Sequence, residues 1–158
     1  MIELCVKMPK RTRKIIFSGD IGRYHRPLLH DPHSFKEADT LIMEATYGDR
    51  LHGSETSSLK KLETIINETY QQGGNVSIPT FAIERAQELL YDLNKLLRAN
   101  RIPNIITFLD SPMAISITQA FKQFPSYFDE EAQEMLNRHR ELFNFPLLKM
   151  CSTTEESK

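Results

Sequence analysis

The sequence predicts an α/β fold, a parallel sheet flanked by helices, preceded by a short β-rich segment. Three observations support this. Helix-like and strand-like runs alternate from residue 57 onward, the first residues alternate as a strand does, and 40% of the 158 residues are hydrophobic, enough for a substantial core. Alternating strands and helices favour right-handed crossovers, which give parallel strands covered on both faces.

The β-rich beginning contains three short strand-like runs. They are residues 2–6, 14–18 and 40–44. The basic segment 7–13 has the polarity of a hairpin connection, and residues 19–39 are rich in Gly, His and Pro, which is typical of a long loop. Asp20 and Glu44 are therefore both expected at strand ends.

The remainder carries the helical periodicity and its stop signals. Helices are expected at residues 57–72, 82–100, 112–124 and 128–145, and strands at 75–78, 104–109 and 147–150. Ser111 followed by Pro112 is a strong helix start, because serine caps the first turn and proline fits its first position. A shift in composition near Thr46 marks the expected domain boundary.

Composition limits the function classes. The 20 Lys and Arg against 21 Asp and Glu give a formal net charge of -1, so any nucleic-acid binding has to be local. Cys5 and Cys151 lie far apart and in no metal-binding spacing, which suits a reducing, cytoplasmic environment. No apolar run approaches the roughly 20 residues of a membrane span, so no membrane partner is expected.

Two carboxylates are candidates for chemistry. Asp20 lies at a strand end between glycines, where the sheet fixes the backbone and small residues let an ion or a phosphate approach. Glu44 has the same kind of position. The alternative is that each carboxylate caps a turn, which is the commoner role of such residues.

Four segments carry a more specific pattern. They are Ser-Gly-Asp-Ile-Gly-Arg at 18–23, Glu-Ala-Thr-Tyr-Gly at 44–48, Ile-Pro-Thr-Phe-Ala-Ile-Glu-Arg-Ala-Gln-Glu-Leu-Leu at 78–90, and Asp-Ser-Pro-Met-Ala at 110–114. In this order they resemble the motifs of the β-CASP family of metallo-β-lactamase-fold RNA nucleases. The departures are Ala45, where the family commonly has Ser, and Glu84, where many members have Gly. The resemblance covers nearly the whole chain.

This resemblance implies a fold and a metal centre. Residues 1–45 would be part of a metallo-β-lactamase domain and residues 46–158 part of a β-CASP domain. Asp20 would be a catalytic metal ligand between two zinc ions, and Glu44 would orient a metal-binding histidine. Because both would face a common cleft, the two carboxylates are expected at the C-terminal ends of neighbouring strands on one edge of the same sheet. The family's His-x-His-x-Asp-His motif is absent, since the five histidines are at 25, 30, 33, 52 and 139.

The resemblance also implies substrate contacts. The helix start at Ser111 would bind an RNA phosphate through its free N–H groups, and Arg85 would pair with another phosphate. The alternatives are a plain helix cap for Ser111 and a surface ion pair with Glu88 or Asp92 for Arg85.

The chain is therefore predicted to be part of a zinc-dependent ribonuclease. It is expected to be inactive by itself, because a single carboxylate binds zinc only weakly. RNA is the expected partner, and a homo-oligomer is compatible with the sequence. One alternative is a non-catalytic module that binds RNA or a protein partner. Another is an unrelated nucleotide-binding α/β domain that uses the Ser111 helix start. The loop histidines His25, His30 and His33 have irregular spacing, which favours a solvated loop over a metal site.

Overall fold

The computed structural model describes residues 1–51, 55–139, 141–153 and 155–157 and has a mixed α/β fold. These residues divide into two compact units. Unit 1 comprises residues 1–26 and 30–51, and unit 2 comprises residues 27–29 together with the described residues from 55 onward. Among the described residues, no helix combines the length and the apolarity required to cross a bilayer.

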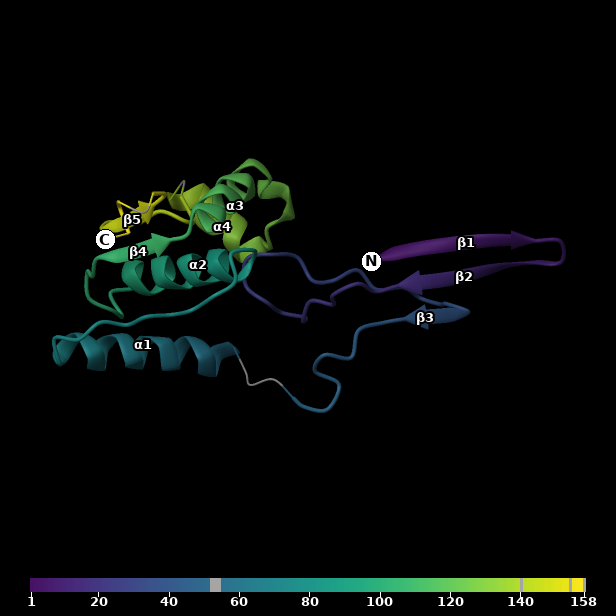
Figure 1. The fold of residues 1–158 in the computed structure, drawn as a ribbon, viewed down its shortest axis with the longest axis horizontal. Coiled ribbons are helices and arrows are strands. Elements are labelled where there is room, and N and C mark those ends of the chain that lie inside the picture. The colour runs from purple at the N-terminus through teal and green to yellow at the C-terminus, as the bar shows by residue number, and fades with distance from the viewer. Residues whose placement is uncertain (52–54, 140, 154, 158) are drawn as a thin grey trace. The chain divides into compact units, whose positions relative to one another are not determined.

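Unit 1 is built on a three-stranded sheet. Its strands are β1 (Ile2–Met8), β2 (Arg11–Phe17) and β3 (Thr40–Ile42), in the order β1-β2-β3. The first two form a long antiparallel hairpin with a turn at Pro9 and Lys10, and β3 pairs in parallel with β2. The outgoing chain ends of β2 and β3 therefore lie at the same edge of the sheet (Figure 1).

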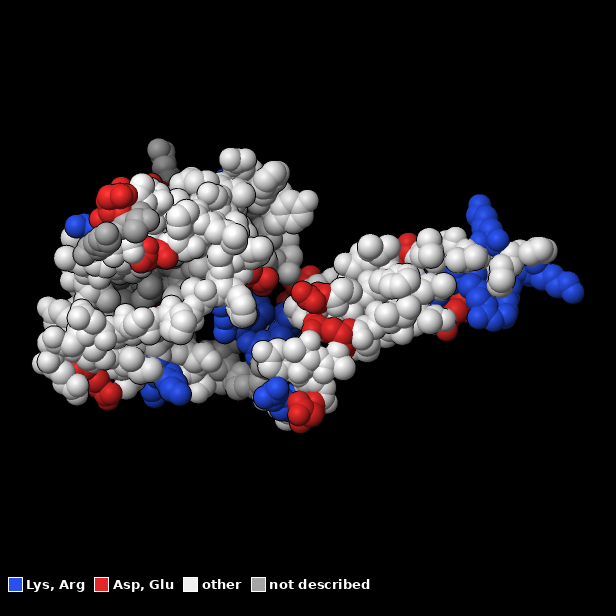
Figure 2. Space-filling model, in the orientation of Figure 1, with Lys and Arg blue, Asp and Glu red and all other residues white. Residues whose placement is uncertain are grey.

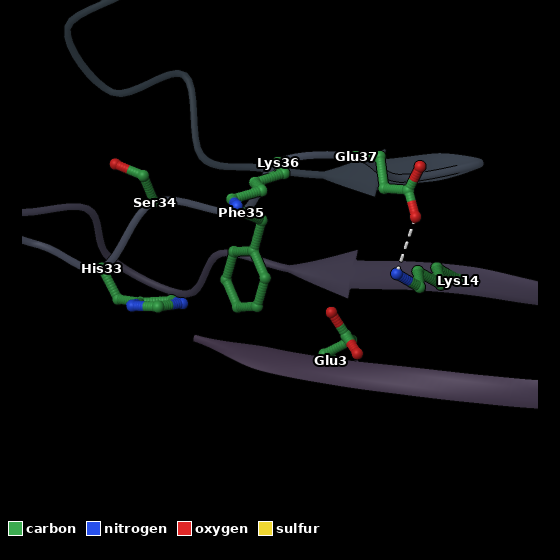
Figure 3. A pocket seen from close by; sticks show the side chains of 7 residues that line it. All are labelled: Glu3, Lys14, His33, Ser34, Phe35, Lys36 and Glu37. Carbon is green, nitrogen blue, oxygen red and sulfur yellow. Dashed lines mark hydrogen bonds and ion pairs between the residues drawn. The ribbon is translucent and has the colours of Figure 1, made fainter.

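The two faces of this sheet differ in how far their side chains are buried. Side chains alternate between faces along a strand, so the register assigns the apolar residues of one face. They are Ile2, Leu4, Val6, Met8, Ile15, Phe17 and Ile42, most of them exposed. On the other face Ile16 is only 3% exposed. That face carries Glu3 and Lys14, which line an open pocket with residues 33–37; Figure 3 shows Phe35 reaching from this loop toward β2.

Unit 2 combines helices with a small parallel sheet. Its elements are α1 (Glu55–Gln71), α2 (Arg85–Arg98), β4 (Thr107–Asp110), α3 (Pro112–Gln123), the 3-10 turn η1 (Pro125–Tyr127), α4 (Glu130–His139) and β5 (Leu148–Cys151). Strands β4 and β5 pair in parallel, with Thr107 opposite Leu148 and Asp110 opposite Cys151.

The core of unit 2 is centred on α2. Tyr91 and Leu96 of this helix are fully buried. They belong to one apolar cluster with Leu28 and with Phe128 and Phe143, whose rings meet edge to face with centroids 6.0 Å apart. Edge-to-face packing adds to the gain from burying the rings.

Two buried amides of α2 tie this core together. Gln87 donates its amide N–H groups to Thr118 Oγ1 at 2.9 Å and to the Ala114 carbonyl at 3.3 Å, which fixes α2 against α3. Asn94 donates to the carbonyl oxygens of Glu141 and Leu142, which lie beyond the end of α4. The hydrogen bonds that both amides donate specify where the neighbouring segments lie, although Gln87 Oε1 is buried with no hydrogen-bond partner among the described residues.

Three expected elements differ from the structure. Residues 75–78 are not a strand and have no ladder partner among the described residues. The helix expected over 128–145 ends at His139; residue 140, inside that range, lies outside the described residues. The expected connection 7–13 is mostly strand, because a two-residue turn closes the hairpin. Parallel pairing in unit 2 is confined to β4 and β5 among the described strands.

Candidate functional site

The ends of β2 and β3 are joined beyond the regular ladder. The Ser18 N–H donates to the Ile42 carbonyl at 2.9 Å, which extends the pairing by one residue. Ser18 is only 2% exposed. Its hydroxyl accepts a hydrogen bond from the Glu44 N–H at 3.3 Å and donates one to the Gly19 carbonyl at 2.6 Å. A buried serine therefore holds the two outgoing chains side by side.

The turn that carries Asp20 depends on a glycine and on Glu44. Gly19 has φ +59°, in the left-handed region that other residues adopt only with strain. Directly after Asp20, the Ile21 N–H donates to Glu44 Oε1 at 2.5 Å, and the Thr46 hydroxyl donates to Glu44 Oε2 at 2.7 Å. The Glu44 carboxylate thus ties the turn after β2 to the segment after β3.

These contacts distinguish the two carboxylates. The Ile21 N–H, and after it the Thr46 hydroxyl, stabilise the ionised form of Glu44 and lower its pKa below the usual value. Asp20 is exposed, and its carboxylate makes no hydrogen bond or ion pair within the described part of the chain. The expectation that both residues lie at the outgoing ends of neighbouring strands on one sheet edge is confirmed.

The described residues do not assemble a complete metal site. No group of three or more His, Cys, Asp or Glu side chains in these ranges could hold an ion. Asp20 could supply one ligand. Of the loop histidines, His25 has a 91% exposed side chain 3.8 Å from Asp31, and His33 packs edge to face with Phe35, so neither is arranged as a ligand.

The two residues expected to contact substrate both lie at helix starts in unit 2. Ser111 is the N-cap of α3, and its hydroxyl accepts from the Ala114 N–H at 3.2 Å. Arg85, the first residue of α2, donates to Glu88 Oε2 at 2.6 Å. The expected helix cap and the expected Arg85–Glu88 ion pair are therefore both present, while phosphate contacts stay predictions.

Gln87 brings these two helix starts together, and sequence reasoning did not identify it. Its amide links the first turn of α2 to Ala114 and Thr118 of α3. Phe81, just before α2, is 83% exposed. A buried amide cannot be distinguished from a surface one by the helical pattern alone, since Gln occupies both.

Comparison with known proteins gives the family. Residues 86–158 match the Beta-Casp domain family. The chain belongs to the β-CASP family of metallo-β-lactamase-fold RNA nucleases, as its motifs indicated. This relation argues against an unrelated nucleotide-binding domain.

Several relatives carry names that refer to RNA. The chain is 38% identical to a ribonuclease of Thermus thermophilus over 146 residues, which is 92% of the chain and 33% of that protein. It is 32% identical to an RNase J-like protein of Methanocaldococcus jannaschii over 78% of the chain and 30% of the relative. It is also 35% identical to cleavage and polyadenylation specificity factor 73 of Drosophila melanogaster, over 55% of the chain and 13% of the relative. The chain thus spans about a third or less of these relatives.

Proposed function

We propose that this chain is part of a zinc-dependent ribonuclease that hydrolyses RNA phosphodiester bonds, with Asp20 as a ligand at its metal centre. The observation that carries the proposal is the free, exposed carboxylate of Asp20 on a turn fixed by Glu44 and Ser18. A carboxylate that a fixed backbone turn carries, and that has no partner among the described residues, is suited to bind a cation. Relatives named as ribonucleases supply the reaction class.

Glu44 would act as a positioning residue. Both of its oxygens accept hydrogen bonds from the chain itself, and one of the donors is the backbone next to Asp20. Loss of this carboxylate would loosen the turn and let the Asp20 carboxylate move. A free lone pair on Glu44 could still orient a histidine, as the family resemblance implies.

Arg85 and Ser111 would contact the RNA backbone in unit 2. They open two helices whose first turns are held together by Gln87, so both candidate contacts lie at one end of the helix pair. Glu88, whose side chain is 5% exposed, holds one nitrogen of the Arg85 guanidinium, and the Arg85 side chain remains 57% exposed. An arginine oriented in this way can offer its remaining N–H groups to a phosphate.

The chain alone would be inactive. Zinc needs about four ligands. Asp20 is one, and the others would come from polypeptide that the printed sequence does not contain, as the relatives' greater length allows. A cytoplasmic location and a homo-oligomer stay predictions.

A chimera tests the proposal. The aligned third of the Thermus thermophilus ribonuclease would be replaced by this chain, and the zinc-dependent cleavage of a single-stranded RNA measured with and without Asp20→Asn. We expect the unsubstituted chimera to cleave and Asp20→Asn to lower kcat at least about 100-fold, since a metal contributes several kcal/mol to the transition state. The control is Asp49→Asn, which removes an exposed carboxylate of the same unit.

Each outcome discriminates between hypotheses. If Asp20→Asn cleaves as fast as the unsubstituted chimera, Asp20 is not a ligand and the proposal fails. If the chimera binds RNA in a folded state and binds zinc but never cleaves, the non-catalytic RNA-binding alternative is favoured.

A further inference from the structure

The β1–β2 hairpin carries a local excess of positive charge. Between Glu3 and Asp20 the sequence has five cations, Lys7, Lys10, Arg11, Arg13 and Lys14, and no carboxylate. The chain as a whole has a formal net charge of -1, so this excess is confined to one element. Figure 2 shows Lys and Arg side chains gathered at the turn of the hairpin.

Most of this charge is not neutralised within unit 1. Lys14 is paired with Glu37 at 2.9 Å. The other four cations of the hairpin have no ion-pair partner among the described residues. In unit 2, Lys95, Arg101 and Arg138 each pair with a glutamate, while exposed lysines such as Lys60 and Lys61 are spread along a helix that also carries glutamates.

The strand register arranges these cations. Arg11 lies opposite Met8 and Arg13 opposite Val6, so both arginines are on the same face, about 7 Å apart along β2. The Nε of Arg13 is buried with no hydrogen-bond partner among the described residues, so a phosphate could reach only the other two nitrogens of this guanidinium.

We propose that the turn end of the β1–β2 hairpin, defined by Lys7, Lys10, Arg11 and Arg13, binds the phosphate backbone of single-stranded RNA. The inference rests on the proposed ribonuclease function and adds a second contact region in unit 1. From Arg11 to the end of β2 the strand is about 20 Å long, so the hairpin would hold substrate well away from Asp20. Lys7 lies on the opposite face of the hairpin from Arg11 and Arg13, and Lys10 lies in the turn, so the positive charge surrounds the tip of the hairpin. A flexible single strand of phosphates can follow such a tip better than a membrane plane can.

Fluorescence anisotropy with a labelled 20-nucleotide oligouridylate and the 158-residue chain tests the inference. The hairpin variant is Lys7→Gln, Lys10→Gln and Arg11→Gln, which changes three exposed side chains. The matched control is Lys60→Gln, Lys61→Gln and Lys122→Gln, three exposed lysines of unit 2 with the same change in charge. Neither variant touches the buried Arg13 Nε or the residues assigned to chemistry.

We expect the hairpin variant to reduce the magnitude of the slope of log affinity against log salt concentration by about 2. Each phosphate contact on a single strand contributes about 0.7 to this slope, and the variant removes three cations. Over a salt change from 50 to 200 mM this corresponds to a difference of about 20-fold in affinity. The control should keep the affinity and slope of the unsubstituted chain. An equal loss in both variants, no loss in the hairpin variant, or hairpin-dependent binding to phosphatidylserine vesicles without RNA binding would overturn the inference.

The failures of the two proposals are distinguishable. Hairpin-dependent RNA binding by the chain, with no cleavage by the chimera, supports the inference and counts against catalysis. Cleavage by the chimera with hairpin-independent binding supports the ribonuclease and overturns the inference.

Discussion

Replacing Asn94 by alanine should destabilise unit 2 far more than the same substitution at an exposed asparagine would. Asn94 is fully buried, and its amide nitrogen lies 2.8 Å from the Leu142 carbonyl and 3.2 Å from the Glu141 carbonyl. Its Oδ1 accepts from Arg98 Nε at 2.8 Å. The substitution removes these bonds and leaves the Leu142 carbonyl buried without a donor.

The magnitude follows from the burial of that carbonyl. A typical hydrogen bond contributes about 1 kcal/mol net, whereas a buried acceptor left unpaired costs about 1–3 kcal/mol. Arg98 is exposed and regains water, so it adds little. We therefore expect Asn94→Ala to lower the free energy of unfolding by about 3 kcal/mol, or about 12 °C in Tm for a unit of this size.

Asn67 provides the matched control. Its amide nitrogen also donates to two backbone carbonyls, those of Glu63 and Arg101 at 2.9 Å each, but the Arg101 bond is exposed to solvent. Water replaces such a donor, so Asn67→Ala should cost less than about 1 kcal/mol. Urea unfolding of the full chain measures both. Equal losses in the two variants would refute the argument that burial of the acceptor sets the cost.

Three further predictions concern single groups. Tyr91→Phe should leave stability unchanged or raise it by up to about 1 kcal/mol in urea unfolding, because the buried Tyr91 hydroxyl has no hydrogen-bond partner in the described part of the chain. A clear loss would mean that the hydroxyl is bonded. The pKa of Glu44 is lower in the folded chain than the ordinary glutamate pKa of about 4.3. The stability that its carboxylate contributes is therefore complete above that ordinary value and is lost as the pH falls through the lower pKa of the folded state. The difference in stability between the unsubstituted chain and Glu44→Gln should shrink from pH 7 to pH 3. The chain should bind less than one zinc per molecule at micromolar metal, because Asp20 alone of the expected ligands is present, and calorimetry showing a tight stoichiometric site would contradict this.

The strand ends and helix caps were predictable because their signals are local. Alternation and glycine placed Asp20 beyond a strand, and Ser111-Pro112 placed the start of α3. The parallel pairing of β2 with β3 was implied only by the shared role of Asp20 and Glu44. The hydrogen bond from Ile21 to Glu44 could not be predicted, because it depends on the exact turn after each strand.

The errors come from elements that depend on distant partners. Residues 75–78 have the composition of a strand, but a strand needs a neighbour to pair with, and Val76 and Ile78 stay 37% and 41% exposed. The helix after Phe128 stops early although Leu142 and Phe143 are buried. Their segment gives its carbonyl oxygens to the Asn94 amide, and Pro146 disfavours helix just before it.

The position of Leu28 affects the order in which the chain folds and where it can be cut into separately folding pieces. This residue follows β2 and precedes β3, yet it is fully buried in the core of unit 2, where Leu28 and Asp129 exchange hydrogen bonds 101 positions apart. A piece cut at residue 46 would lack a core side chain whose loss costs about 2–5 kcal/mol. Because contacts between residues so distant in sequence form slowly, the last step in completing unit 2 should be the arrival of this three-residue segment from the beginning of the chain.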